Sequence, residues 1–419
     1  MANDQMMAQM SKKGGFIAAL DQSGGSSPGA LRLYGIPDTA YSGDAEMFRL
    51  IHQMRVRIMT APAFKGDKVI GTILFEGTMD GILAVFAGSH GSSSRRAPRF
   101  AKKTNPIRLP RVPAPGRLTG VMIMANDQMT AQMSKKGGFI AALDQSGGSS
   151  PGALRLYGIP DSAYSGEAEM FRLIHQMRVR IMTAPAFTGD KVIGTILFEG
   201  TMDGEVRGKP TASYLWEERQ VVPFVKVDRG LEPEKDGVQL MRPMPQLDQL
   251  CDRAVKAGVY GTKMRSVINL ASKEGIAAIA AQQFEVGERI AQHGLMPILE
   301  PEVSIKSPDK KGAEAILFDE LKKLTDALPA GRQVMFKLTL PDVPDLYKPL
   351  VDHPRVARVV ALSGGYTRAD ACQRLAANHG MIASFSRALV QDLRISMSDA
   401  EFEAALAQSI DEIYRASIT

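Results

Sequence analysis

The stretch PILEPEVSIKSPDKKGAEAILFDELKKLTDALPAGRQVMFKLTL, residues 297–340, contains the pattern that decides the fold. A short apolar run at 297–303 precedes a segment at 314–328 whose apolar residues are spaced three and four apart, and a second apolar run follows at 334–340. These spacings predict a strand, a helix and a strand. Strands joined through a helix usually run parallel in one sheet, so the stretch predicts a parallel βαβ unit.

The same alternation covers most of the chain from residue 139 onward. Apolar runs predict six more strands, at 139–144, 195–200, 222–228, 260–268, 356–363 and 381–387. Helical spacing predicts further helices at 170–180, 247–258, 275–294, 369–380 and 399–416. Eight strands alternating with helices predict an α/β fold, the closed (β/α)8 TIM barrel, in which catalytic groups lie at the C-terminal ends of the strands.

The beginning of this barrel occurs twice in the sequence. Residues 1–81 match 124–204 at a constant offset, and the copies differ only at Met7/Thr130, Thr39/Ser162, Asp44/Glu167 and Lys65/Thr188. Such near identity indicates a recent tandem duplication, because structural repeats normally drift in sequence. Using the first copy would require a loop of about 140 residues instead of about 20, which loop entropy disfavours by roughly 1.5–2 kcal/mol. We therefore expect 124–419 to form the complete barrel and 1–81 to be a displaced, truncated duplicate.

The segment between the copies, residues 82–123, has a composition of its own. It contains eight Lys or Arg, five Pro and no Asp or Glu, so the rest of the chain sums to −2 although the whole carries +6. This composition predicts disorder. It fits either a basic arm for RNA or an anionic surface, or a junction between two gene copies. No aromatic platform or RNA-binding motif accompanies the charges, which favours the junction and no nucleic-acid partner.

The remaining composition indicates an ordinary globular protein. No apolar run has the length of a membrane span and the start lacks a signal-peptide core, so we expect no membrane association and a cytoplasmic location. Cys251 and Cys372 are far apart and have no nearby His. We therefore expect two buried, reduced thiols, with neither a disulfide nor a zinc site.

Charged residues interrupt the predicted strands near their C-terminal ends. Lys337 lies in VMFKLTL, where desolvation favours the uncharged amine that attacks carbonyl groups, although a lysine reaching water from a strand end explains the sequence equally well. Glu300 and Glu302 point to one side of their strand, where mutual repulsion favours proton transfer by one of them. Two more strands carry the pairs Lys263 with Arg265 and Lys226 with Asp228. Together these pairs predict a catalytic site at the barrel mouth.

Small residues after three of the strands suggest anion sites. Ser363, Gly364 and Gly365 follow the seventh strand and Arg387 ends the eighth, where barrels commonly bind a phosphate through backbone amides and a fork-shaped Arg. The sequence DQSGGSS after the first strand offers a second group of hydroxyls. An anion site on each side of a central lysine predicts a substrate phosphorylated at both ends.

On these residues, the chain from 124 to 419 resembles the class I fructose-bisphosphate aldolases, in their shorter bacterial form. The motifs match in order: ALDQSGGS around Asp144, VKVD with Lys226, KMR with Lys263 and Arg265, EPE with Glu300 and Glu302, the Schiff-base strand with Lys337, LSGG at 362–365, and Arg387. The sequence departs from the family pattern at Gln145, where the family has Glu, and at Ser386, where it has Gly.

The resemblance implies a metal-independent, cofactor-free aldolase of glycolysis and gluconeogenesis that splits fructose 1,6-bisphosphate reversibly into dihydroxyacetone phosphate and glyceraldehyde 3-phosphate. Lys337 would form the Schiff base, Glu300 with Glu302 would act as general acid and base, Asp144 would take the C4 hydroxyl proton, and Lys263 would assist. One phosphate would be held by Ser363, Gly364, Gly365 and Arg387, the other by Lys226 with Ser146 and Ser149, and Arg265 would belong to the binding site. The family is typically homo-oligomeric.

Two alternatives remain open at the level of sequence. A Schiff-base aldolase acting on another sugar phosphate would carry the same central lysine and carboxylates. A non-catalytic fusion product would result if the extra segment displaced the true first strands and left a binding or scaffold protein.

Overall fold

The computed structural model describes residues 126–419 in full and the backbone of 120–125. Nearer the N-terminus it describes strands β1 (Phe16–Leu20) and β2 (Val69–Leu74), residues 27–42, and six helical positions between 47 and 58. The chain divides into two compact units, 1–110 and 111–419. Most of the basic segment at 82–123 lies outside the described residues. The disorder predicted for it therefore stays a prediction.

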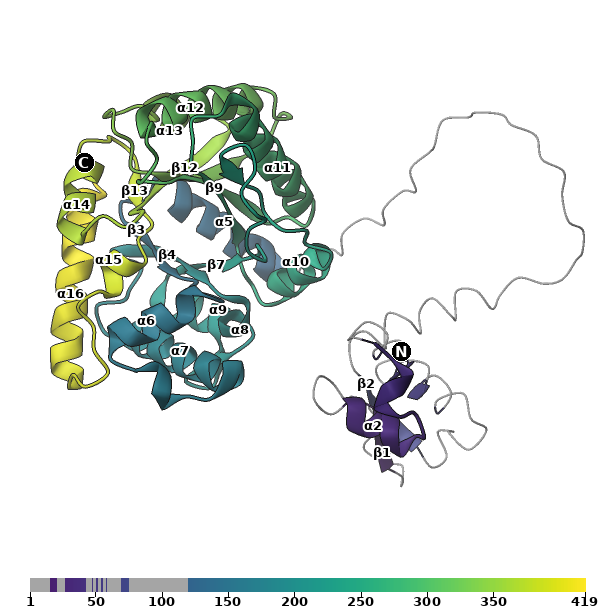
Figure 1. Ribbon diagram of the computed structural model, residues 1–419. Coiled ribbons are helices and arrows are strands. Elements are labelled where there is room, and N and C mark those ends of the chain that lie inside the picture. Colours follow the sequence, from purple (N-terminus) through teal and green to yellow (C-terminus); the bar gives the residue numbers. More distant parts are fainter. Residues whose placement is uncertain are drawn as a thin grey trace, which may run out of the picture. The chain divides into compact units, whose positions relative to one another are not determined.

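Eight parallel strands form a barrel in the second unit (Figure 1). They are β3 (Phe139–Leu143), β4 (Val192–Leu197), β7 (Val222–Lys226), β9 (Gly261–Ile268), β10 (Met296–Val303), β11 (Val334–Thr339), β12 (Val356–Leu362) and β13 (Ile382–Ala383). Each pairs with the next in this order. The remaining gap is bridged where the amide of Ala142 donates to the carbonyl oxygen of Phe385 at 3.1 Å. The predicted (β/α)8 barrel is confirmed.

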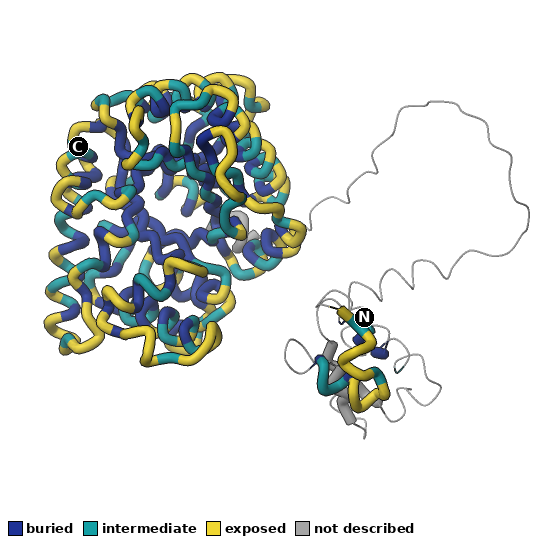
Figure 2. Tube along the Cα trace, viewed as in Figure 1, coloured by how far each residue is buried: buried dark blue, intermediate teal, exposed yellow. Residues whose placement is uncertain are grey.

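Helices cover the outside of the barrel and turn their apolar faces toward the strands (Figure 2). Six correspond to the predicted ones: α7 (Gly166–Thr183), α10 (Leu247–Lys256), α11 (Lys273–Gln292), α12 (Lys310–Asp326), α14 (Arg368–Ala376) and α16 (Asp399–Ala416). Helix α16 begins where expected because of a capping box. The Ser398 hydroxyl accepts from the amide of Glu401, whose carboxylate accepts from the amide of Ser398.

Shorter elements complete the connections between strands and helices. They are α6 (Ser149–Tyr157), η3 (Asp161–Ala163), α8 (Glu199–Met202), α9 (Thr211–Ser213), the single π turn η4 (Tyr214–Glu218), α13 (Lys348–Val351) and α15 (Arg387–Val390). Strands β5 (Glu205–Val206) and β6 (Lys209–Pro210) form a small hairpin, and β8 (Val238–Gln239) pairs antiparallel with β9. Within the described residues, no helix is long and apolar enough to cross a membrane.

Helix α5 (Gly120–Lys135) closes the N-terminal end of the barrel. Its Met129 and Met133 pack against the apolar side chains that fill the barrel interior. Arg358 of β12 donates to the carbonyl oxygen of Met133 at 2.7 Å, and Gln132 donates to that of Ile193 at 2.8 Å. These bonds satisfy main-chain oxygens at the base of the barrel and, with the packing of Met129 and Met133, hold α5 against this end.

Two predicted strands differ from the structure. The strand predicted at 195–200 starts earlier, at Val192, and its last two residues belong to α8. The strand predicted at 381–387 is short, and its last residue, Arg387, begins α15. In both cases the predicted strand continues into residues that the backbone uses to start a helix.

The described part of the first copy repeats the local pairing of the second. β1 and β2 are parallel, with Phe16 opposite Val69 and a register shift after Phe16, just as Phe139 lies opposite Val192 in β3 and β4. Leu31, Met47, Ile51 and Met54 form a small cluster. The described residues of the first copy therefore repeat the strand pairing that the same sequence makes in the second.

Candidate active site

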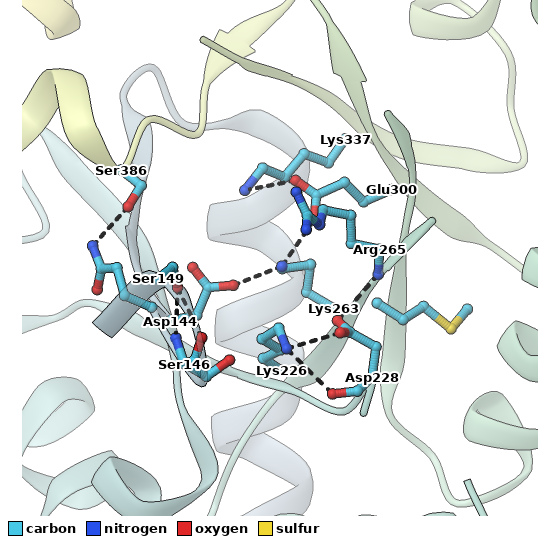
Figure 3. A network of polar contacts seen from close by, with 12 residues as sticks. Asp144, Ser146, Ser149, Lys226, Asp228, Lys263, Arg265, Glu300, Lys337 and Ser386 are labelled. Carbon is cyan, nitrogen blue, oxygen red and sulfur yellow. Dashed lines mark hydrogen bonds and ion pairs between the residues drawn. The ribbon is translucent and has the colours of Figure 1, made fainter. Parts of the chain in front are cut away.

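Four charged side chains form a continuous chain of ion pairs across the inside of the barrel, between β9, β10, β11 and the residue that follows β3 (Figure 3). Lys263 Nζ lies 2.6 Å from Asp144 Oδ2 and 2.8 Å from Glu300 Oε2. Lys337 Nζ lies 3.1 Å from Glu300 Oε1. All four side chains are buried or nearly so, with exposed fractions of 4–10%. The structure thus brings together four residues from β9, β10, β11 and the end of β3.

The alternation of each strand explains why these charges face the interior. In β11, Met335 belongs to the interior cluster while Phe336 and Leu338 face the helices, so Lys337 lies on the inner side one layer above Met335. The same two-residue step leads from Ala142 to Asp144, from Phe224 to Lys226 and from Ile298 to Glu300. The lower layers are apolar and fill the barrel, whereas the upper layer is charged and lines its mouth.

The burial of this cluster is compensated by its charge pairing. Burial opposes ionisation of Asp144, but Lys263, Lys337 and Lys226 outweigh it and hold the pKa of this carboxyl well below its usual value. Burial likewise disfavours the Lys263 ammonium, but Asp144, Glu300 and Asp228 outweigh it and raise the pKa of Lys263. Asp144 is therefore a carboxylate and Lys263 an ammonium at neutral pH.

The two other predicted pairs extend the cluster to one side. Lys226 Nζ lies 2.8 Å from Asp228 Oδ1, and Asp228 Oδ2 accepts from the backbone amide of Arg265 at 3.2 Å. Arg265 pairs with Glu302 at 2.9 Å, and although burial disfavours its charge, Glu302 and Glu300 raise the pKa of its guanidinium. Glu302 is thus tied to Arg265, whereas Glu300 contacts the two buried lysines.

The hydroxyl-bearing turn after β3 lies beside Asp144 (Figure 3). The Ser149 hydroxyl accepts from the amide of Ser146 at 3.0 Å and donates to its carbonyl oxygen at 2.9 Å. Ser149 is the first residue of α6, so the hydroxyl that closes this turn belongs to the start of the helix. Neither serine forms a hydrogen bond with Lys226, although the three residues are predicted to bind one phosphate.

The turn after β12 and the start of α15 lie together. Gly364 and Gly365 have φ values of +59° and +120°, which a residue with a side chain adopts only under strain. A Cβ atom added at Gly365 would lie 3.5 Å from Arg387 Nη2. Ser363 is buried, and its carbonyl oxygen accepts from the amide of Tyr366 at 2.9 Å. The Arg387 guanidinium is exposed, so Ser363, Gly364, Gly365 and Arg387 form a second polar group at the mouth.

Sequence reasoning missed one residue in this region, Arg178 of α7. It is fully buried and donates to the Gln145 carbonyl oxygen. The sequence does carry a signal for it, a charged residue on the apolar face of a helix. Helical spacing assigns one face to positions 170, 174, 177, 178 and 181, and of these only 178 is charged.

Both cysteines are free thiols. Burial raises the pKa of Cys251 to about 12 and that of Cys372 to about 11. Cys251 is buried as expected, but Cys372 of α14 is only partly buried, and its thiol lies 3.9 Å from the carbonyl oxygen of Glu412. Neither thiol is in the group of residues at the mouth.

The fold and the site together define a (β/α)8-barrel protein with two lysines and two carboxylates buried at the mouth. A model of the family "Fructose-bisphosphate aldolase class-I" matches residues 127–311. A class 1 fructose-bisphosphate aldolase from Synechocystis sp. is 55% identical over 294 residues, which are 70% of this chain and 98% of that protein. Another from Porphyromonas gingivalis is 55% identical over 293 residues, covering 70% of this chain and 99% of that protein. The chain belongs to the class I fructose-bisphosphate aldolase family.

A solved structure shares the fold at a greater distance. The fructose-bisphosphate aldolase of Plasmodium falciparum, solved in complex with TRAP and a small-molecule inhibitor, superposes with a TM-score of 0.56 at 19% identity. The match covers 74% of this chain and 98% of that one. At this identity the likeness supports the barrel fold alone.

Proposed function

We propose that this protein cleaves fructose 1,6-bisphosphate into dihydroxyacetone phosphate and glyceraldehyde 3-phosphate, reversibly, through a Schiff base on Lys337. The observation that carries the proposal is the contact between Lys337 and Glu300 at 3.1 Å, in a site that also holds Asp144 and Lys263. A buried amine with a carboxylate at hydrogen-bond distance has both the nucleophile and the proton-transfer group that imine formation requires.

The reaction begins at the C2 carbonyl carbon of the open-chain substrate. Lys337 gives one proton to Glu300, and the neutral amine then adds to this carbon as a second proton passes from nitrogen to oxygen. Glu300 returns its proton to the new hydroxyl group, and loss of water leaves an iminium ion. Glu300 is positioned to move these protons, because it contacts Lys337 through one oxygen and Lys263 through the other. Lys263 would hold charge near Glu300 during the transfer.

The iminium ion then accepts electrons when the C3–C4 bond breaks. Asp144 is held as a carboxylate by its lysine neighbours, so it is available to take the proton of the C4 hydroxyl. The C4 fragment leaves as glyceraldehyde 3-phosphate. The enamine that remains is protonated at C3, and hydrolysis of the resulting iminium releases dihydroxyacetone phosphate and restores Lys337. Glu302, paired with Arg265, would act beside Glu300.

The two phosphates would bind on opposite sides of Lys337. Ser363, Gly364, Gly365 and Arg387 supply hydroxyl, backbone amides and a guanidinium that makes no ion pair with another described residue. Lys226, Ser146 and Ser149 would bind the other phosphate, with Arg265 beside them. Lys226 already pairs with Asp228, so binding there would exchange a carboxylate for a phosphate.

We assign this chemistry to the second copy, with 1–81 displaced and 82–123 as a connecting segment. β3 and β4, which belong to the second copy, are strands of the barrel sheet. The aligned relatives have about the length of one barrel, since 294 residues cover 98% of one of them. The proposal includes a homo-oligomeric enzyme of the cytoplasm, as is typical of the family.

Borohydride trapping with dihydroxyacetone phosphate tests the proposal on the full chain. Reduction should attach the triose to Lys337, found by peptide mapping, and cleavage of fructose 1,6-bisphosphate should exceed that of fructose 1-phosphate. A preference for fructose 1-phosphate would indicate another sugar-phosphate aldolase, and neither adduct nor cleavage would indicate a non-catalytic product.

The duplicated sequence supplies a matched control for the choice of copy. Asp21 has the same neighbours in sequence as Asp144. Asp144→Asn should abolish cleavage, whereas Asp21→Asn should leave it unchanged. The reverse result would assign the first strand of the working barrel to residues 1–81.

A further inference from the structure

Arg178 is a buried cation whose partners are neutral. Its Nη1 donates to the Thr201 hydroxyl at 2.8 Å, and its Nη2 donates to the carbonyl oxygen of Gln145 and, at 3.3 Å, to Gln145 Oε1. No described carboxylate forms an ion pair with it, and its Nε has no partner among the described residues. Burial lowers its pKa to about 10, against the attraction of Asp144. A buried charge without a partner of opposite charge is destabilising, so Arg178 costs stability where α7 packs beside the turn that follows β3.

Gln145 connects Arg178 to the opposite edge of the barrel gap. Arginine can only donate hydrogen bonds, so the oxygen of the Gln145 amide must face Arg178 and its nitrogen must face away. That nitrogen donates to the Ser386 hydroxyl at 2.7 Å. Gln145 directly follows Asp144, and Ser386 directly precedes Arg387.

These bonds lie where the barrel has its weakest strand pairing. β13 consists of two residues, and a backbone bond from Ala142 to Phe385 closes the gap to β3. The side-chain bond between Gln145 and Ser386 is the next link toward the mouth. It joins the turn that carries Asp144 to the turn that carries Arg387, which the proposed function places on the substrate and on one phosphate.

We propose that Arg178 is a positioning residue which, through Gln145 and Ser386, locks the turn of Asp144 to the phosphate-binding turn of Arg387. The inference rests on the proposed function. The guanidinium fixes the orientation of the Gln145 amide, and the amide fixes the Ser386 hydroxyl. Arg178 itself contacts no substrate, and the two departures of this chain from the family motif, Gln145 and Ser386, are bonded to each other.

Two single substitutions and their combination test the link. Gln145→Met keeps the length of the side chain but removes the amide, and Ser386→Ala removes only the hydroxyl. Each should raise KM for fructose 1,6-bisphosphate about tenfold, equivalent to about 1.4 kcal/mol, and change kcat by less than about threefold. The double variant should lose no more than Gln145→Met alone, because the bond that Ser386→Ala removes is already absent from Gln145→Met. Multiplicative losses, or an unchanged KM, would overturn the proposal.

The first copy again provides the control. Gln22 occupies the position that matches Gln145, and Gln22→Met should leave both constants at their original values. An effect of Gln22→Met instead of Gln145→Met would also refute the proposal.

A binding measurement separates this inference from the proposed reaction. Lys337→Met prevents the Schiff base, so calorimetry with fructose 1,6-bisphosphate in that background measures binding alone. Adding Gln145→Met should weaken binding about tenfold. If the unmodified protein binds fructose 1,6-bisphosphate but does not cleave it, the proposed function fails, while a tenfold loss of affinity on adding Gln145→Met still supports the link. Equal affinities with and without Gln145→Met reject the link, whatever the activity.

Discussion

Lys337 Nζ lies 3.1 Å from Glu300 Oε1, and both side chains are almost completely removed from solvent. Glu300 uses its second oxygen to contact Lys263 at 2.8 Å. One carboxylate therefore lies between two buried amines. This placement makes Glu300 the group through which a proton can move between them.

Glu300→Gln tests this placement. The amide retains the shape of the side chain but cannot take up a proton, so kcat should fall by about 10²- to 10⁴-fold. Borohydride should still trap some triose on Lys337, only more slowly, whereas Lys337→Met should abolish the adduct. Lys306→Met, at an exposed position, serves as a control and should be labelled and active like the original protein. Full activity in Glu300→Gln would contradict the assigned role.

Acid stability should depend on Asp144. Because the folded-state pKa of Asp144 is lowered from 3.8, the unfolded chain binds more protons below about this pH, and the contribution of Asp144 to stability is lost as the pH falls. When the unfolded chain binds one more proton than the folded protein, the free energy of unfolding falls by up to about 1.4 kcal/mol for each unit that the pH is lowered. Urea unfolding between pH 2.5 and 6 should therefore show a shallower dependence for Asp144→Asn.

The exposed Asp127 gives the comparison for this measurement. Asp127→Asn should retain the pH dependence of the original protein. Equal slopes for Asp144→Asn and the original protein would show that Asp144 is not held ionised by its lysine neighbours.

Gly364→Ala should damage the phosphate-binding turn. Its φ of +59° is strained for alanine, and the added Cβ would meet Ile305 Cγ2 at 2.7 Å. We expect at least a tenfold rise in KM for fructose 1,6-bisphosphate. Gly294→Ala has a similar φ of +80° but open space around the Cβ, so it should lower stability by about 1 kcal/mol and leave KM unchanged. If Gly364→Ala and Gly294→Ala raise KM equally, the rise is caused by backbone strain and not by damage to the phosphate-binding turn.

Met133→Ala should destabilise the barrel through its base. Met133 is fully buried against the interior cluster, so the substitution should lower the free energy of unfolding by about 2–5 kcal/mol. Trp216, the single tryptophan of the chain, packs against the same cluster and reports its unfolding by fluorescence. Met10→Ala, at the matching position of the first copy, should not change this transition. A loss below 1 kcal/mol in Met133→Ala would mean that α5 does not seal the interior.

Much of the site followed from two-residue periodicity. The apolar residues around Lys337 predict the strand β11, in which Lys337 must lie on the same side as Met335, and the same alternation places Glu300 above Ile298. The strand boundaries were less predictable. Arg387 follows a run in which apolar residues alternate with Ser384 and Ser386, as in a strand, but the backbone turns into α15 there because β13 pairs over only two residues.

The sequence by itself determined the barrel, its duplicated beginning, and the charged residues of the mouth, because alternation and spacing are local properties of a strand or helix. Only the tertiary structure decided which of these charges pair. Glu300 contacts Lys263 and Lys337 while Glu302 turns to Arg265, since pairing depends on distances between different strands. The bond between Gln145 and Ser386 spans 241 positions and exists only because the closing barrel brings its first and last strands together.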